Sequence, residues 1–235
     1  MDYTEIEDVF VKIGGEFYAS AYNIQAKLKD IKAYVFDWDG VFNDARREVN
    51  LSGSYSMIDT LGIRMLRFAH FLMHKNIARV AVFDEQNNSL AKLWGKAESV
   101  DEVYVSIRNK EEALEHFCTK HGIEPANVVY VFDDILDVST AKKAGIRMAV
   151  GRKESPGLRE YLKNQKLVDY ISGNDGRNHA VREHCELLLM LFNKHHEVID
   201  RMAKYDPACK DFDDRSKQTA TEIYSYSEER FQLTT

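Results

Sequence analysis

The stretch Ile31-Lys-Ala-Tyr-Val-Phe-Asp37-Trp-Asp39-Gly40-Val-Phe42 joins a mostly apolar run to two carboxylates and a glycine. The apolar residues up to Phe36 predict a buried strand, and Gly40 allows the chain to turn directly afterwards. Two ionised carboxylates at the end of an apolar strand repel each other and resist desolvation. Packing alone therefore does not favour Asp37 and Asp39 at this place.

A bound divalent cation would remove that cost, and Mg²⁺ prefers oxygen ligands of this kind. One of the two acids could then act as a nucleophile, as in enzymes that pass through an aspartyl-phosphate. The alternative is a solvated Asp-x-Asp-Gly turn without chemistry, because motifs of this length recur by chance.

Composition limits the class of protein around this stretch. With 235 residues, 44% of them hydrophobic and 30% charged, the chain is expected to be a soluble globular protein. A formal charge of -6 without a basic cluster argues against nucleic-acid and acidic-membrane partners. The acidic start, the short apolar run 187–192 and three cysteines without CxxC spacing favour a cytoplasmic location.

The rest of the chain alternates between strand and helix patterns. Strands are expected at 78–83, 102–105, 128–132, 146–150 and 167–171, and helices at 89–96, 110–121, 135–144 and 158–164. This alternation predicts an α/β fold with a doubly wound, mostly parallel sheet of Rossmann type. In such sheets the ligand lies beyond the carboxyl ends of the strands.

The flanking segments complete the expected organisation. A helical extension covers 1–30, with an interruption near Gly14-Gly15, and the main domain spans 31–205. Within it we expect a small hairpin at 46–57, a helix at 59–74 and a long final helix from 179 to about 205. The tail 206–235 is either a further helix or partly disordered.

Polar residues follow several of the predicted strands. Asp133, Asp134 and Asp137 follow strand 128–132, Lys110 follows strand 102–105, and Asp84 follows strand 78–83. Singly, each has a structural explanation: a helix cap, a solvated ion pair or an exposed loop acid. Together they would meet Asp37 and Asp39 on one edge of one sheet. That edge would offer a cation site, a nucleophile and a lysine for a phosphoryl group.

With these residues the sequence resembles the haloacid dehalogenase (HAD) superfamily. Asp37-Trp-Asp39-Gly40-Val41, Lys110 and Asp133-Asp134-x-x-Asp137 resemble its motifs I, III and IV. The resemblance covers roughly 31–192. It narrows to one branch of the superfamily because of Gly62-Ile-Arg64, Ala180-Val-Arg-Glu183 and the lack of an inserted cap domain. That branch comprises the 3-deoxy-D-manno-octulosonate 8-phosphate phosphatases and related sugar-acid phosphatases.

The resemblance implies a Mg²⁺-dependent phosphomonoester hydrolase acting on a sugar-acid phosphate. It makes Asp37 the nucleophile and Asp39 the general acid/base, and it assigns the metal to Asp37, Asp133 and the Asp39 backbone carbonyl. Lys110 would steady the phosphoryl group and the nucleophile, and Asp134 and Asp137 would support Asp133. It also implies a homotetramer in which the hairpin and neighbouring subunits close the site. Arg64, Arg177 and Asp84 are candidate substrate contacts.

Three residues depart from the family pattern. Asp84 replaces the Thr or Ser of motif II, Phe132 replaces a glycine before the motif IV acids, and Ile58 replaces an arginine. A carboxylate at position 84 can only accept hydrogen bonds and repels an anion. The sequence therefore leaves two functions open: an active phosphatase, or a catalytically impaired member that serves as a binding or assembly subunit. A phospho-receiver domain is disfavoured, because its lysine follows its acidic residues late in the chain, whereas Lys110 precedes Asp133.

Overall fold

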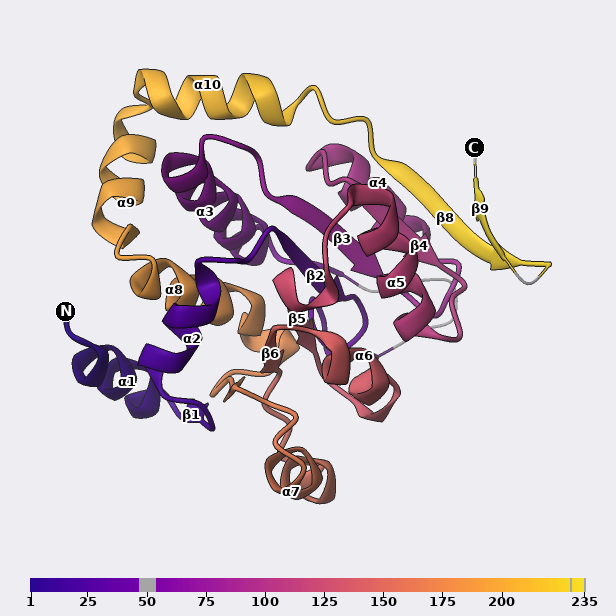
Figure 1. Ribbon diagram of the computed structural model, residues 1–235, viewed down its shortest axis with the longest axis horizontal. Helices are drawn as coiled ribbons and strands as arrows, with labels where there is room; N and C mark the ends of the chain where they lie inside the picture. The colour runs from indigo at the N-terminus through magenta and orange to yellow at the C-terminus, as the bar shows by residue number, and fades with distance from the viewer. Residues whose placement is uncertain (47–53, 229, 235) are drawn as a thin grey trace.

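The computed structural model describes residues 1–46, 54–228 and 230–234. Within these residues, nine strands form one sheet in the order β1-β7-β6-β5-β2-β3-β4-β8-β9 (Figure 1). The seven strands from β7 to β8 run parallel, whereas β1 and β9 are antiparallel additions at the two edges. The predicted doubly wound, mostly parallel α/β sheet is confirmed.

The strands are β1 (Glu16–Phe17), β2 (Ala33–Asp37), β3 (Arg79–Phe83), β4 (Glu102–Val105), β5 (Val128–Phe132), β6 (Ile146–Ala149), β7 (Tyr170–Ile171), β8 (Glu222–Ser227) and β9 (Arg230–Leu233). The α-helices are α1 (Tyr3–Lys12), α2 (Ala21–Leu28), α3 (Met57–His74), α4 (Ser89–Ala97), α5 (Lys110–His121), α6 (Val138–Lys143), α7 (Pro156–Asn164), α8 (Ala180–Leu191), α9 (His195–Lys204) and α10 (Pro207–Ser216). Short 3-10 helices are η1 (Pro125–Asn127), η2 (Ile135–Asp137) and η3 (Gly176–Asn178).

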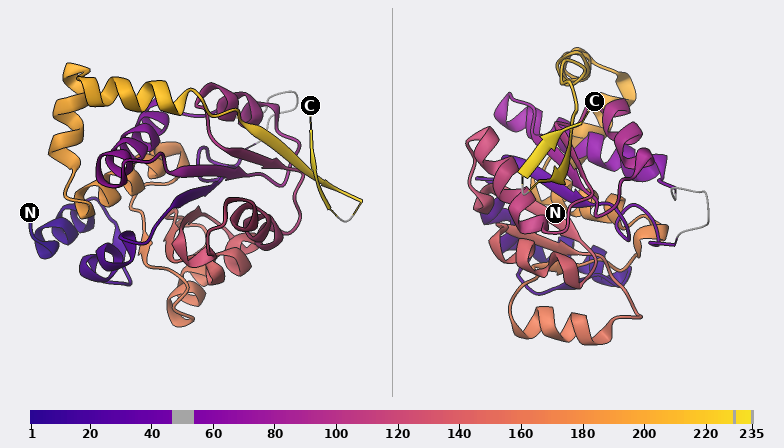
Figure 2. Two further views of the ribbon diagram at one scale, coloured as in Figure 1. Left: turned by 45° about the horizontal axis from the view of Figure 1, so that its top comes forward. Right: turned by 90° about the vertical axis from the view of Figure 1, so that its right-hand side faces the viewer.

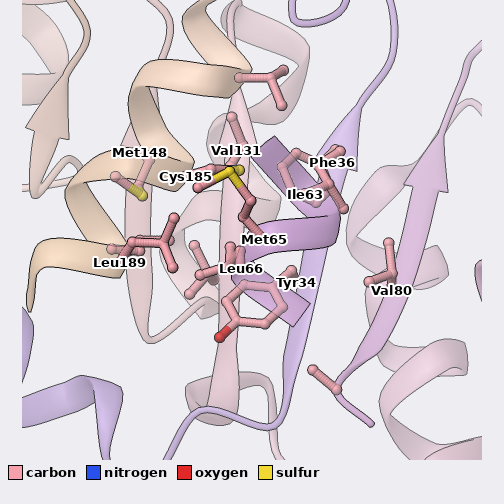
Figure 3. Close-up of a cluster of buried hydrophobic side chains, with 14 of the residues drawn as sticks. Tyr34, Phe36, Ile63, Met65, Leu66, Val80, Val131, Met148, Cys185 and Leu189 are labelled. Atoms are coloured by element: carbon pink, nitrogen blue, oxygen red, sulfur yellow. The ribbon is translucent and has the colours of Figure 1, made fainter. Parts of the chain in front are cut away.

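Helices cover both faces of the sheet, as the views in Figure 2 show. Alternate residues of each strand point to opposite faces, so β2 sends Tyr34 and Phe36 into one apolar core and Ala33 and Val35 into the other. The first core lies beneath α3 and α8 (Figure 3), whose segments contribute Ile63, Leu66, Cys185 and Leu189 among others. The second core lies beneath α5 and α6.

The N-terminal segment is built into the sheet and the core. Its break at Gly14-Gly15 is confirmed, and β1 follows that break and pairs with β7. Ile6, Phe10 and Ile24 are buried in the first core. The segment therefore closes one edge of the sheet and adds apolar side chains to the first core.

The C-terminal segment closes the opposite edge. The predicted long final helix is divided into α8 and α9, because Asn193 between them takes a left-handed conformation with φ of 54°. After α10 the chain forms the β8–β9 hairpin, and β8 pairs in parallel with β4 (Figure 1). The tail thus adds strands that the sequence analysis did not predict.

Two further expectations concern the surface. The hairpin predicted at 46–57 falls largely on residues 47–53, which lie outside the described residues. No separate cap domain interrupts the sheet in the described ranges. None of the helices in those ranges is long and apolar enough to cross a membrane.

Candidate active site

Four neighbouring parallel strands place acidic or basic residues at one edge of the sheet. Asp37 ends β2, Asp84 follows β3, Lys110 begins the helix after β4, and Asp133 follows β5. All four line one cavity of about 220 Å³. The complete lining is Asp37, Asp39, Ala45, Asp84, Glu85, Lys110, Asp133, Asp134, Ile135, Leu136, Asp137 and Arg152. The predicted convergence of the strand-end residues is therefore present.

Lys110 lies at the centre of the cluster. Its Nζ is 2.8 Å from Asp37 Oδ1, 2.8 Å from Asp137 Oδ1 and 3.1 Å from Glu85 Oε1. Burial alone would lower the pKa of Lys110, but the adjacent Asp37 and Asp137 carboxylates outweigh burial and raise the pKa. Lys110 is therefore a permanently charged partner of the Asp37 carboxylate.

Local sequence explains how Lys110 reaches this place. The Asn109 side chain caps α5 by accepting hydrogen bonds from the backbone N–H groups of Glu111 and Glu112, at 3.1 and 3.4 Å. Lys110 is then the first helical residue, where the helix dipole disfavours a cation. The surrounding carboxylates offset that cost, so the position is stable only because the site is acidic.

Asp137 is held by a fixed set of donors. Its Oδ1 accepts hydrogen bonds from Lys110 Nζ and from the Tyr130 hydroxyl at 2.5 Å, and its Oδ2 accepts one from Asp134 N at 3.3 Å. Burial and then the Asp137 charge raise the pKa of Tyr130 well above its usual range, so that hydroxyl remains a donor. Asp137 therefore holds Lys110 in position through a fixed hydrogen bond.

A divalent cation fits the oxygen donors of this cluster. Oxygens of Asp37, Asp133 and Asp137 lie within 4.8 Å of one another, and all three residues are buried. Burial and then the Asp137 charge raise the pKa of Asp37, and the same two causes raise the pKa of Asp133 to about 7. Both Asp137 oxygens already accept hydrogen bonds, Oδ1 from Lys110 and Tyr130 and Oδ2 from Asp134 N. Lys110 also contacts Asp37 and Arg152 contacts Asp133, so a cation held by Asp37 and Asp133 would share these carboxylates with those side chains.

Asp84 and Glu85 make the cavity more acidic than the family pattern requires. Asp84 is 1% exposed, and its Oδ1 accepts a hydrogen bond from Gln86 N at 2.7 Å. Among the described residues the lining holds seven carboxylates and two cationic side chains. A phosphate dianion entering such a cavity is repelled unless a further cation accompanies it.

The structure shows where Phe132 and Ile58, two of the three departures from the family pattern, lie. The Phe132 ring is fully buried in the core beneath α5 and α6, stacked on Tyr130 with an interplanar angle of 10°. It is not among the residues that line the cavity with Asp133. Ile58 lies in the first turn of α3 and is exposed.

Arg64 and Arg177, the candidate substrate contacts, lie elsewhere. Arg64 Nη2 contacts both carboxylate oxygens of Asp213 on α10, at 2.6 and 2.7 Å, in a separate cavity of about 290 Å³. The Arg177 guanidinium is 68% exposed and lies 3.6 Å from Asp44. Neither is among the residues that line the Asp37 cavity.

Glu183, near the start of α8, supports the turn that precedes η3. Glu183 accepts hydrogen bonds from Gly173 N at 2.8 Å and Asn174 N at 2.9 Å, which holds the turn before η3. In η3 a Cβ added to Gly176 would lie 2.3 Å from the Gly40 carbonyl oxygen. The start of η3 therefore packs directly against the backbone of Gly40 and Asn43.

Three lining or supporting residues escaped sequence reasoning. Glu85 contacts Lys110, Tyr130 donates to Asp137, and Arg152 Nη2 pairs with Asp133 Oδ2. Tyr130 and Arg152 belong to no motif quoted above. Arg152 does follow β6, so its position at a strand end was the available signal.

Comparisons with known proteins agree with the resemblance. No protein-family model matches the chain. The 3-deoxy-D-manno-octulosonate 8-phosphate phosphatase of Salmonella typhi is 28% identical over 176 residues, which cover 73% of this chain and 86% of that protein.

Solved structures give the same result. The phosphatase of that name from Moraxella catarrhalis, in complex with magnesium, phosphate and KDO, aligns with a TM-score of 0.62 at 26% identity and covers 76% of this chain and 97% of its own. The cobalt-bound Haemophilus influenzae phosphatase aligns with a TM-score of 0.60 at 25% identity, covering 72% of this chain and 93% of its own. In sequence and fold, the chain resembles the capless 3-deoxy-D-manno-octulosonate 8-phosphate phosphatases of the HAD superfamily.

Proposed function

We propose that this HAD-like chain is a Mg²⁺-dependent phosphomonoester hydrolase that acts through an aspartyl-phosphate on Asp37. The observation that carries the proposal is the buried ion pair of 2.8 Å between Asp37 and Lys110, with Asp133 and Asp137 oxygens close by. A nucleophilic carboxylate, a fixed cation and oxygen ligands for a metal are the groups that phosphoryl transfer needs.

The chemistry divides into two displacements at phosphorus. In the first, an Asp37 carboxylate oxygen bonds to phosphorus, the bond to the leaving oxygen breaks, and Asp39 protonates that oxygen. In the second, Asp39 takes a proton from water, the water oxygen bonds to phosphorus, and the bond to Asp37 breaks. Asp39 and Asp37 return to their starting states, and inorganic phosphate leaves.

In the proposed mechanism, Lys110 and a bound metal ion would both stabilise negative charge on the phosphoryl group. Lys110 holds Asp37 in place and donates to a phosphoryl oxygen, while Asp137 keeps the lysine oriented. When bound, Mg²⁺ would neutralise charge on the phosphoryl oxygens. Asp37, Asp133 and the Asp39 carbonyl are the groups proposed to hold it, with Asp134 in support.

The proposed substrate is a sugar-acid phosphate of the 3-deoxy-octulosonate 8-phosphate type. Similarity to phosphatases with that name supports it, as does the KDO molecule in the Moraxella catarrhalis structure. The expected assembly is a homotetramer in the cytoplasm, with the segment 46–57 and neighbouring subunits completing the substrate site. A mass measurement in solution tests the assembly.

A second function has one specific observation in its favour. The buried Asp84 carboxylate stands where the family has a hydroxyl that donates to the phosphoryl group. A chain that keeps the fold but binds phosphate poorly would serve as a binding or assembly subunit. The two functions differ in whether the chain hydrolyses phosphate esters at all.

Hydrolysis of 4-nitrophenyl phosphate and of 3-deoxy-D-manno-octulosonate 8-phosphate with Mg²⁺ separates the two functions. We expect the parent chain to hydrolyse both and Asp37→Asn to lose several orders of magnitude in rate. Asp44→Asn, an equal change of charge on a half-exposed residue nearby, is the control and should keep the rate. Full activity in Asp37→Asn would contradict the nucleophile, and an inert parent that gains activity with Asp84→Thr would favour the impaired chain.

A further inference from the structure

Arg152 occupies a defined place beside the carboxylates proposed to hold the metal. It follows β6 by way of Val150 and Gly151. Gly151 N donates to Ser172 Oγ at 3.0 Å, and a Cβ added to Gly151 would lie 2.1 Å from the Ser172 carbonyl oxygen. The backbone that carries Arg152 is therefore held tightly against the chain that follows β7.

The guanidinium of Arg152 reaches the motif IV acids from this anchor. Its Nη2 pairs with Asp133 Oδ2, and its Nη1 lies 3.5 Å from Asp134 Oδ2. The Asp133 side chain is 5% exposed and that of Arg152 is 22% exposed. The pair is thus mostly shielded from water, where a charge-assisted hydrogen bond is strong.

Gly40 locates the guanidinium more closely. A Cβ added to Gly40 would lie 1.9 Å from Asp133 Oδ2 and 2.1 Å from Arg152 Nη2. Both groups therefore pack on the backbone that directly follows Asp39. The same backbone borders the position proposed for the metal, so a cation held by Asp133 must share or replace the contact with Arg152.

From these contacts we propose that Arg152 is a tethered counter-ion that competes with the divalent cation for Asp133 and weakens its binding. The inference rests on the metal site of the proposed function and adds a residue that sets the affinity of that site. A guanidinium carries one charge and only donates hydrogen bonds, so it neutralises Asp133 without accepting oxygen ligands as a metal does. With Arg152 in contact, the cluster is partly neutralised before any cation arrives.

The test measures Mn²⁺ binding by the full chain without substrate, from the free-ion signal in electron paramagnetic resonance. We expect Arg152→Ala and Arg152→Gln to bind Mn²⁺ about 10- to 100-fold more tightly than the parent, the range that one hydrogen bond to a charged group represents. Arg177→Ala is the matched control, because it removes the same charge from an exposed arginine outside the cavity. It should change Mn²⁺ affinity less than threefold.

The outcomes separate this inference from the function beneath it. Equal Mn²⁺ affinity in the parent and both Arg152 variants overturns the competition, and so does an equal gain in Arg177→Ala, which reflects net charge. Failure of every chain to bind Mn²⁺ overturns the proposed metal site together with the inference. A gain confined to the Arg152 variants supports the inference, whatever rate of hydrolysis is measured.

Discussion

Replacing Lys110 by methionine should destabilise the protein strongly, because the lysine is the shared partner of three carboxylates. Its Nζ lies 2.8, 2.8 and 3.1 Å from Asp37, Asp137 and Glu85, and its side chain is 3% exposed. Methionine keeps most of the apolar stem and removes the charge. Loss of one partner of a buried ion pair costs about 3–5 kcal/mol, since the remaining charges stay buried without compensation.

Urea denaturation at pH 8 without divalent cations measures this loss. A change of that size corresponds to a fall in Tm of about 6–20 °C for a chain of this length. The matched control is Lys143→Met: Lys143 also faces two carboxylates, Glu111 and Glu115 at 3.3 and 3.5 Å, but is 46% exposed. We expect no measurable shift of the denaturation midpoint in the control.

The loss should depend on pH and on added cations. Without Lys110, the folded-state pKa of Asp37 rises further above its unfolded value, so the penalty is largest at high pH and decreases as the carboxyl group takes up a proton. Mn²⁺ should restore part of the stability at pH 8. A Lys110→Met chain that loses less than about 1 kcal/mol at pH 8 would refute a buried cationic centre.

Three further perturbations test the fold around the site. Gly40→Ala should reduce stability and Mn²⁺ affinity more than Gly122→Ala does. Both positions have a positive φ (86° and 61°), but of the two only Gly40 packs against Asp133 and Arg152. Equal losses in the two variants would contradict this packing. Burial lowers the pKa of His184 to about 3. The free energy of unfolding should therefore fall as the pH falls below about 6.5, because at His184 only the unfolded chain takes up the proton. The contribution is about 2 kcal/mol at pH 5, and His184→Leu should remove that pH dependence in urea titrations at pH 7 and 5. Deleting residues 218–235 exposes the edge of β4 and should increase self-association in light scattering; an unchanged mass distribution would contradict the edge-covering role of β8.

The sequence was sufficient for the parts of the site that lie at strand ends. Asp37, Asp84, Lys110 and Asp133 each follow a predicted strand, and parallel strands necessarily bring their carboxyl ends to one edge. The same logic reached the sheet, whose buried strands have a clear apolar pattern. These features are local in sequence and repeated, so periodicity detects them.

Features that depend on contacts across the chain were not accessible in this way. The pairing of Arg152 with Asp133 joins the ends of β6 and β5, and the place of Arg152 after a strand does not by itself identify Asp133 as its partner. The β8–β9 hairpin was missed because Ile223, Tyr224 and Tyr226 lie in an otherwise polar segment. The stacking of Tyr224 on Tyr104 stabilises the hairpin only after β4 has formed. Tertiary packing decides such segments.

Chemical trapping at Asp37 tests the central claim most directly. Borohydride reduces an aspartyl-phosphate to homoserine, so the chain is mixed with 4-nitrophenyl phosphate and Mg²⁺, treated with borohydride, digested and sequenced by mass spectrometry. We predict homoserine at position 37 in the parent chain, and aspartate at that position when substrate is omitted. A chain that hydrolyses the ester while position 37 remains aspartate, or while homoserine appears at Asp39 or Asp133, would contradict the nucleophilic role of Asp37.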